Sequence, residues 1–314
     1  SAASDVYKRQ TSYDVDAPGW GCNPDTQFST NYRYPHLLGE YVWTGFDYLG
    51  EPTPFNSDNT NLLNFRTDPS KRAELEKQLA ELARTQPPSR SSYFGIVDLA
   101  GFPKDRYYLY QSHWRPDYPM AHILPHWNWT GREGQIIPVH VYTSGTEAEL
   151  FVNGKSYGRK AKEEGKDFRL VWDSVVYQPG SVKVIAYKDG KEWAKDEIQT
   201  TGEAKKIQLS VDHASIIGNE DELAFVTATI VDASGRKVPT ACLPLKVEVT
   251  GCGELVATDN GDPTSFTPFQ SAERESFNGL ALAIVRGKKG TTGKMQVQVS
   301  GAGLESDSIE IEVK

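Results

Sequence analysis

Short runs in which hydrophobic and polar residues alternate fill most of the chain after Pro119. Such alternation is typical of half-buried β-strands. Turn residues separate the runs at roughly the 8–12-residue spacing of a β-sandwich. A polar break at residues 200–206 divides them into two sets. The first set covers residues 136–143, 148–154, 169–180 and 181–200, and the second begins at residue 207 and ends near residue 313. The pattern predicts two all-β modules.

Two dipeptides inside the first set are strong turn signals. Asn153-Gly154 and Asp189-Gly190 each separate two alternating runs. Asn-Gly and Asp-Gly tolerate the positive φ angles that a two-residue hairpin turn requires. We therefore expect a β-hairpin at each of these positions.

The pattern before Pro119 is different and predicts a mixture of strands and helices. Residues 37–46, LLGEYVWTGF, form a mostly apolar run, as in a strand of a parallel sheet covered on both faces. In residues 68–84, leucine recurs with helical spacing, and Pro69 lies where the first turn of a helix would begin. Both features favour a helix. Residues 1–35 look irregular, residues 92–101 look like a strand or a pair of turns, and residues 103–114 fit a short helix with Tyr107, Tyr110 and Trp114 on one side.

Charge and cysteine usage exclude several classes of function. The net charge of −8 disfavours nucleic acid or an anionic membrane as the main partner. No apolar run approaches the roughly 18 residues of a membrane span. Cys22, Cys242 and Cys252 show no zinc-binding spacing. Cys242 and Cys252 could pair in an oxidising compartment, but two separate, buried thiols are the favoured interpretation.

Residues 39–55, GEYVWTGFDYLGEPTPF, crowd aromatic and acidic side chains at the end of the predicted strand. Hydrolysis of a glycosidic bond needs a paired acid and carboxylate, and an indole can stack on a sugar face. Trp43 and Asp47 are thus candidate substrate-binding residues, with a core tryptophan and a turn carboxylate as the alternatives. Glu40 and Glu51 are a weak candidate pair, because Glu40 has the opposite strand parity to Trp43.

Several long strings resemble one enzyme family. They are EYVWTGFDYLGEPTPF (40–55), SSYFGIVDLAGFPKDRYYLYQSHW (91–114), HILPHWNW (122–129), AELFVNGKSYG (148–158), YQPGSVKVIAYKDG (177–190), DNGDP (259–263) and FNGLALAIV (277–285). Together they resemble the C-terminal part of family 2 glycoside hydrolases of the bacterial β-galactosidase-like branch. The resemblance covers roughly residues 12–314.

The resemblance implies a mixed fold, with an incomplete (β/α)8 barrel C-terminal segment followed by two immunoglobulin-like β-sandwich domains. The expected boundaries are 1–125 for the barrel remnant, 126–202 for the first sandwich and 203–314 for the second. Residues 39–52 fall on the eighth barrel strand and its loop, where barrel enzymes bind substrate. Trp43 then matches the tryptophan that lines the sugar subsite. Asp47 and Tyr48 lie beside it, but the resemblance assigns neither of them a role, and Asp47 stays a candidate contact because of its position alone.

The family's catalytic residues have no match in the chain. Its acid/base Glu follows an Asn and its nucleophile is a second Glu, and both are expected upstream of residue 1. No Asn-Glu pair occurs in residues 1–125, and Asn219-Glu220 lies in the second β module. The resemblance thus implies the C-terminal part of a retaining exo-glycosidase, which we expect to be inactive alone. We expect no cofactor and no metal ligand among these residues, and the metal dependence of the intact enzyme stays open.

The expected substrate of the intact enzyme is an oligosaccharide or glycoside with a terminal β-galactoside. Glucuronidases and mannosidases share the family, so other sugars stay open, as does an oligomer. A periplasmic or extracellular location is favoured for the intact bacterial enzyme. The alternative function is a non-catalytic carbohydrate-binding or adhesive β-sandwich protein.

Two further motifs are weaker candidates. Residues 125–129, PHWNW, could bind a ligand, but packing at a domain junction is favoured. Asp259 and Asp262 of DNGDP offer too few oxygens for calcium, which takes about six to eight. A tight structural turn is the favoured interpretation there.

Overall fold

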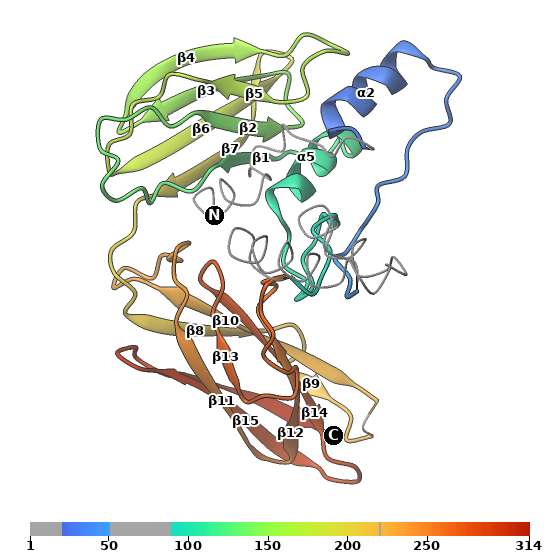
Figure 1. The fold of residues 1–314 in the computed structure, drawn as a ribbon, viewed down its shortest axis with the longest axis vertical. Coiled ribbons are helices and arrows are strands. Elements are labelled where there is room, and N and C mark those ends of the chain that lie inside the picture. The colour runs from blue at the N-terminus through green and yellow to red at the C-terminus, as the bar shows by residue number, and fades with distance from the viewer. Residues whose placement is uncertain (1–20, 51–88, 220) are drawn as a thin grey trace, which may run out of the picture. The chain divides into compact units, whose positions relative to one another are not determined.

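The computed structural model describes residues 21–50, 89–219 and 221–314 (Figure 1). The chain divides into two compact units. The first comprises residues 1–98 and 102–200, and the second comprises residues 99–101 and 201–314. The predicted helix at 68–84 and the candidate Glu51 lie outside the described residues. The predicted boundaries at 125/126 and 202/203 stay predictions.

The first unit contains a β-sandwich of two antiparallel sheets. One sheet has the order β1-β2-β5 and the other β4-β3-β6-β7. The strands are β1 (Ala121–Leu124), β2 (Val139–Thr143), β3 (Glu147–Val152), β4 (Lys155–Ala161), β5 (Leu170–Trp172), β6 (Ser181–Lys188) and β7 (Lys191–Gln199). In β3 every second side chain is buried, as the alternating pattern requires.

The core of this sandwich includes both tryptophans of the PHWNW motif. Trp127 and Trp129 are buried in the same cluster as the inward residues of β2, β3 and β6. The Trp127 indole donates to the Gln178 carbonyl at 2.9 Å, and that of Trp129 to the His126 carbonyl at 2.8 Å. The motif is therefore a packing element, and the two indoles are not available to a ligand.

Both predicted hairpin turns are confirmed. Asn153 and Asp189 have φ angles of 50° and 52°, and the glycine after each also has a positive φ. These turns connect β3 to β4 and β6 to β7. The local sequence therefore determined the strand connections here.

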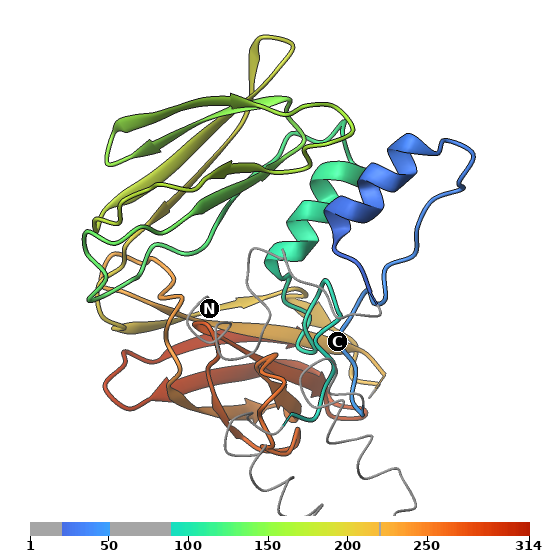
Figure 2. The same ribbon diagram turned by 45° about the horizontal axis from the view of Figure 1, so that its top comes forward.

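Within residues 21–50 and 89–200, two helices accompany the first sandwich, α2 (Pro24–Arg33) and α5 (Asp105–Trp114), and they lie side by side in Figure 2. The helix expected at 103–114 is confirmed by α5. The expectation that residues 1–35 are irregular is wrong for α2. The Asn23 side chain caps α2 by accepting from the Thr26 amide at 3.0 Å. Only two residues of α2 are buried, Pro24 and Phe28. Because so few apolar positions repeat, the sequence pattern did not reveal this helix.

Aromatic packing joins α2 to α5 and to the sandwich. The buried Phe28 ring stacks on His113 with centroids 3.9 Å apart. It meets Tyr110 and Phe168 edge-on at 5.3 Å and 5.2 Å. Such perpendicular pairs are favoured by the ring quadrupoles. One phenylalanine of α2 therefore contacts both the helix α5 and the segment that leads into β5.

A half-buried ion pair between Arg169 and Asp25 orients α2 on the sandwich. Arg169 Nε donates to Asp25 Oδ1 at 2.9 Å, and its Nη2 makes a second contact with the same carboxylate. Arg169 also donates to the Tyr142 hydroxyl at 3.3 Å. The Ser29 hydroxyl donates to the Gly165 carbonyl at 3.1 Å. A two-pronged arginine–carboxylate contact fixes orientation as well as distance, so α2 is held in one register on the sandwich.

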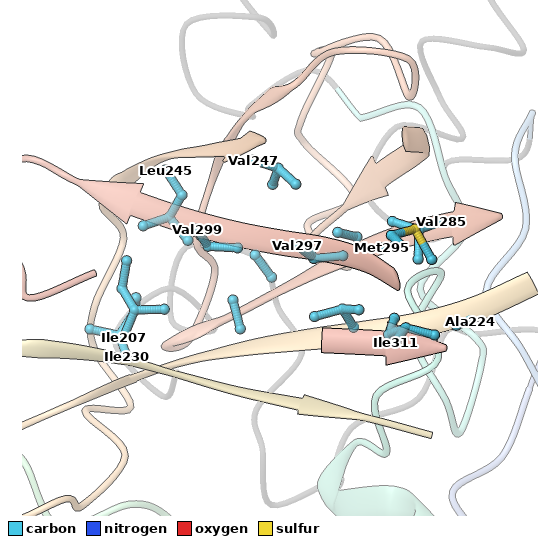
Figure 3. Close-up of a cluster of buried hydrophobic side chains, with 14 of the residues drawn as sticks. Ile207, Ala224, Ile230, Leu245, Val247, Val285, Met295, Val297, Val299 and Ile311 are labelled. Carbon is cyan, nitrogen blue, oxygen red and sulfur yellow. The ribbon is translucent and has the colours of Figure 1, made fainter. Parts of the chain in front are cut away.

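The second unit is a larger β-sandwich. Its sheets have the orders β12-β14-β10-β8 and β13-β11-β15-β16-β9, with all neighbours antiparallel except β16 and β9. The strands are β8 (Lys206–Val211), β9 (Ser215–Ile216), β10 (Leu223–Val231), β11 (Pro244–Gly251), β12 (Gly253–Asp259), β13 (Glu273–Glu275), β14 (Leu280–Gly287), β15 (Gly293–Gly301) and β16 (Asp307–Val313). Figure 3 shows Met295, Val297 and Val299 of β15 among the residues of its core. The prediction of β-sandwich modules is confirmed.

The DNGDP motif of this unit forms the predicted tight turn. Asn260 Oδ1 accepts from the Asp262 amide at 3.0 Å, and Asp262 Oδ1 accepts from the Thr264 amide at 2.9 Å. The buried Arg274 donates to the carbonyls of Thr258 and Pro268, each at 2.8 Å. These bonds tie the loop after β12 to β13 and account for the motif without a ligand.

The cysteines are free thiols in the described residues. Cys242 is exposed and Cys252 is partly buried, with its thiol near the Thr292 carbonyl at 3.2 Å. They do not pair, and the expectation that both are buried is wrong for Cys242. No helix within the described ranges has the length and apolar character to cross a membrane.

We predict that His140 makes the first unit sensitive to acid. His140 lies buried in β2, and burial, aided by the charge of Arg169, lowers its pKa to about 4. Between pH 6.5 and 4 the unfolded chain therefore binds more protons than the folded chain. The free energy of unfolding should decrease as the pH is lowered through this window, by at most about 3 kcal/mol. His140→Phe should remove this part of the pH dependence, as measured by thermal unfolding at pH 7 and pH 4.5.

The matched comparison is the wild-type chain, measured at the same two pH values. If His140→Phe and the wild type lose the same stability between the two pH values, the assignment to His140 is wrong.

Candidate functional site

Two segments that lie far apart in the sequence meet around the predicted site residues. Residues 44–50 pair with residues 90–97 through isolated bridges, Phe46 with Val97 in parallel and Leu49 with Ser91 in antiparallel orientation. The Asp47 amide donates to the Val97 carbonyl, and the Val97 amide to the Gly45 carbonyl, both at 3.0 Å. The segment that carries Trp43 and Asp47 is thus attached along one side.

The expectation of a strand covered on both faces at 37–46 is not met in the described residues. Residues 37–46 form no regular strand, and Leu38 and Tyr41 are fully exposed. An apolar run becomes a buried strand only when partners cover it, and within the described ranges it borders residues 94–97 on one side. These exposed apolar side chains mark an uncovered surface.

Trp43 is one of several exposed aromatic residues of the segment. Its side chain is 69% exposed. The indole Nε1 donates to the Tyr48 hydroxyl at 3.1 Å, and the two rings are nearly perpendicular with centroids 6.4 Å apart. The peptide between Trp43 and Thr44 is cis. Because the side chain is open to solvent, the core interpretation of Trp43 does not hold for the described residues, and the indole has a face that a ligand could cover.

Asp47 is the reverse case, a buried carboxylate only 4% exposed. Its Oδ1 accepts from the Gly95 amide at 2.8 Å and from the Ser92 hydroxyl at 3.4 Å. Its Oδ2 lies 2.5 Å from Lys104 Nζ. The structure places Asp47 on the same segment as Trp43 but directs its oxygens to the protein. A contact between Asp47 and a substrate remains a prediction.

Burial and pairing act in opposite directions on this pair. Burial raises the pKa of Asp47, while the ammonium of Lys104 and the hydrogen bond from Gly95 lower it. Burial also lowers the pKa of Lys104, and Asp47 opposes that shift. Each charge thus offsets the energetic cost of desolvating the other. Removing one partner would leave the other charge buried without its counter-charge.

Gly95 allows the backbones of the two segments to approach closely. A Cβ at this position would lie 2.2 Å from the Asp47 amide nitrogen and 2.4 Å from the Val97 carbonyl oxygen. Both neighbours are backbone atoms, which cannot rotate away. The glycine is therefore required for the hydrogen bond that Asp47 receives from the Gly95 amide.

Glu40 is bound to the two helices. Its Oε1 accepts from the Trp114 indole at 3.2 Å, and its Oε2 accepts from the side-chain nitrogen Nδ2 of Asn31 at 3.5 Å. Burial raises its pKa, and the bond from Trp114 acts against that shift. Glu40 thus ties residues 39–49 to α5 and α2, and its proposed partner Glu51 lies outside the described residues.

Sequence reasoning assigned no role to three residues of this arrangement, Tyr48, Ser92 and Lys104. The position of Tyr48 beside Asp47 is evident from the sequence, but its contact with Trp43 is not. Ser92 and Lys104 are distant in sequence, and no local pattern links them to Asp47. Across the described ranges, no three His, Cys, Asp or Glu side chains come together as a metal site.

Comparison with known families gives two matches. The model of "Glycoside hydrolase family 2 C-terminal domain 5" matches residues 207–310, most of the second sandwich. A domain of unknown function (DUF4982) matches residues 134–194, most of the first sandwich.

Comparison with individual proteins extends over nearly the whole chain. A β-galactosidase of Bacteroides ovatus is 37% identical over 302 residues, covering 96% of this chain and 31% of the relative. A putative β-glucuronidase of Formosa agariphila is 30% identical over 257 residues, covering 80% and 22%. The crystal structure of a β-glycosidase from Bacteroides vulgatus superimposes with a TM-score of 0.82 at 32% identity, covering 99% of this chain and 35% of that one. The chain spans about a third or less of the length of each of these proteins.

We predict that Gly95→Ala disrupts the site locally. The added methyl group has no room beside the Asp47 amide, so the two segments must separate, at a cost of about 1–3 kcal/mol. The melting temperature of the first unit should fall. Gly45→Ala is the matched control, because a Cβ there meets nothing within 4 Å. Equal melting temperatures for the two variants would show that the close approach at Gly95 does not exist.

Proposed function

Because the chain belongs to glycoside hydrolase family 2, whose C-terminal domain 5 it carries, we propose that it is the C-terminal part of a retaining exo-β-galactosidase. The intact enzyme would hydrolyse terminal non-reducing β-galactosides. The sugar is proposed from the β-galactosidase relative, which is more similar than the β-glucuronidase relative, at 37% against 30% identity.

The observation that carries a role for this region is the exposed indole of Trp43. Its N–H is bound to Tyr48, and most of the side chain faces solvent. A flat apolar face of this kind fits the C–H face of a sugar ring. We therefore assign Trp43 to contact with the terminal sugar, and Asp47 to the same site beneath it.

We further propose that residues 1–125 are the end of a catalytic (β/α)8 barrel. The parallel bridge between Phe46 and Val97 and the helix α5 after it fit a strand–helix repeat. The exposed side chains of Leu38 and Tyr41 fit a strand whose neighbours belong to the rest of such a barrel. The loop after Asp47 would then lie at the mouth where barrel enzymes bind substrate.

The chemistry requires two carboxyl groups about 5–5.5 Å apart that flank the glycosidic bond. Neither described carboxylate near Trp43 suits this role, because Glu40 is bound to Trp114 and Asp47 is paired with Lys104. We propose that the catalytic pair lies outside these 314 residues. One Glu would form the glycosyl-enzyme, the other would act as acid and then base, and Trp43 would hold the sugar between them.

The first prediction is that the purified 314-residue chain does not hydrolyse nitrophenyl β-galactoside. Both catalytic carboxylates are missing in this proposal, and each is essential to the mechanism. Release of nitrophenol measures the activity, and the full-length Bacteroides ovatus β-galactosidase serves as the positive control. Turnover by the chain that disappears in Glu40→Gln or Glu51→Gln would refute the proposal.

The second prediction concerns Trp43 in an intact enzyme that carries this region. Trp43→Ala should lower kcat/KM about five- to 200-fold, since an aromatic contact of this kind contributes about 1–3 kcal/mol. The melting temperature should change little, because the side chain is exposed. A structural tryptophan would instead cost about 3–5 kcal/mol of stability on truncation.

The matched control is Phe266→Ala, which removes an exposed aromatic side chain from the second unit. It should leave kcat/KM unchanged. A large fall in melting temperature for Trp43→Ala, with normal kcat/KM in the folded fraction, would remove Trp43 from the substrate site.

A further inference from the structure

Trp43 combines high exposure with a defined ring orientation. An indole that is 69% exposed has few packing neighbours to restrict its rotamers. Its Nε1–H is nevertheless 3.1 Å from the Tyr48 hydroxyl, and the Tyr48 ring meets it at 88°. The orientation of the indole therefore depends on where Tyr48 is held.

The backbone amide and the backbone carbonyl of Tyr48 are both hydrogen-bonded to Ser92. Its amide donates to the Ser92 hydroxyl at 3.1 Å, and its carbonyl accepts from the Ser92 amide at 2.8 Å. Ser92 is fully buried. One serine thus binds both backbone polar groups of Tyr48, one through its side-chain hydroxyl and the other through its backbone amide.

The buried Asp47 connects this serine to the rest of the loop. The Ser92 hydroxyl donates to Asp47 Oδ1, which also accepts from Gly95, and Asp47 Oδ2 contacts Lys104. Lys104 Nζ lies 3.3 Å from the Tyr93 carbonyl as well. The contacts around Asp47 therefore form a brace that joins residues 47–48 to residues 92–95 and 104.

We infer that Tyr48 is a positioning residue for Trp43, and that the brace of Ser92, Asp47 and Lys104 fixes Tyr48. The inference rests on the proposed function, in which the Trp43 indole contacts the terminal sugar. A side chain that is already ordered loses less conformational entropy when a ligand binds, so the hydroxyl of Tyr48 favours binding without touching the sugar.

The first measurement uses the 314-residue chain and no sugar. Tyr48→Phe keeps the ring and removes the oxygen that accepts from the indole. In ¹H–¹⁵N spectra, with the Trp43 indole signal assigned from Trp43→Phe, the variant should shift that signal and speed its exchange with water about threefold or more. Tyr118→Phe, at another exposed tyrosine of the same unit, should leave the signal unchanged.

The second measurement uses an intact enzyme that carries this region. Tyr48→Phe should lower kcat/KM about two- to tenfold by raising KM, while kcat and the melting temperature change little. Ser92→Ala, which removes the hydroxyl that binds the Tyr48 amide, should act in the same direction. It provides a second test if Tyr48→Phe fails to fold.

The outcomes separate the inference from the proposed function. An indole signal that is unchanged in Tyr48→Phe overturns the inference, as does a normal kcat/KM in Tyr48→Phe when Trp43→Ala is impaired. If the signal shifts while Trp43→Ala keeps a normal kcat/KM, the sugar contact of Trp43 is refuted. The positioning of Trp43 by Tyr48 is supported even then.

Discussion

The buried carboxylate of Asp47 is the group on which the arrangement around Trp43 depends. A charge removed from water is tolerated only when partners surround it, and Asp47 recruits Ser92, Gly95 and Lys104 for this purpose. Meeting that requirement draws two distant segments together. Tyr48 follows Asp47 in the chain and is placed by the same contacts, and through it the exposed indole acquires a defined direction.

The first β-sandwich is connected to this segment through α2 and α5. Arg169 holds α2 through Asp25, and Phe28 of α2 packs on α5. The two helices then bind Glu40 through Trp114 and Asn31. The first sandwich is thereby connected, through the two helices, to the segment that carries Trp43.

The two kinds of structure in the chain differ in how they bury apolar surface. The sandwich of residues 201–314 has its own core, in which β15 and β16 contribute buried residues such as Met295 and Ile311. Residues 37–49 instead leave Leu38, Tyr41 and Trp43 exposed. Apolar surface exposed in this way costs free energy in water, and it marks an uncovered face of the segment.

The sequence by itself determined the features that depend on neighbouring residues. Alternation gave the strands, Asn153-Gly154 and Asp189-Gly190 gave two hairpins, and the string around Trp43 indicated the family. It did not predict α2, because that helix has few apolar repeats and is stabilised by Arg169 and Phe168. Nor could it show that Trp43 is exposed while Asp47 is buried. Those states depend on Ser92, Gly95 and Lys104, which approach only after the chain has folded, since burial and ion pairing are properties of tertiary contact.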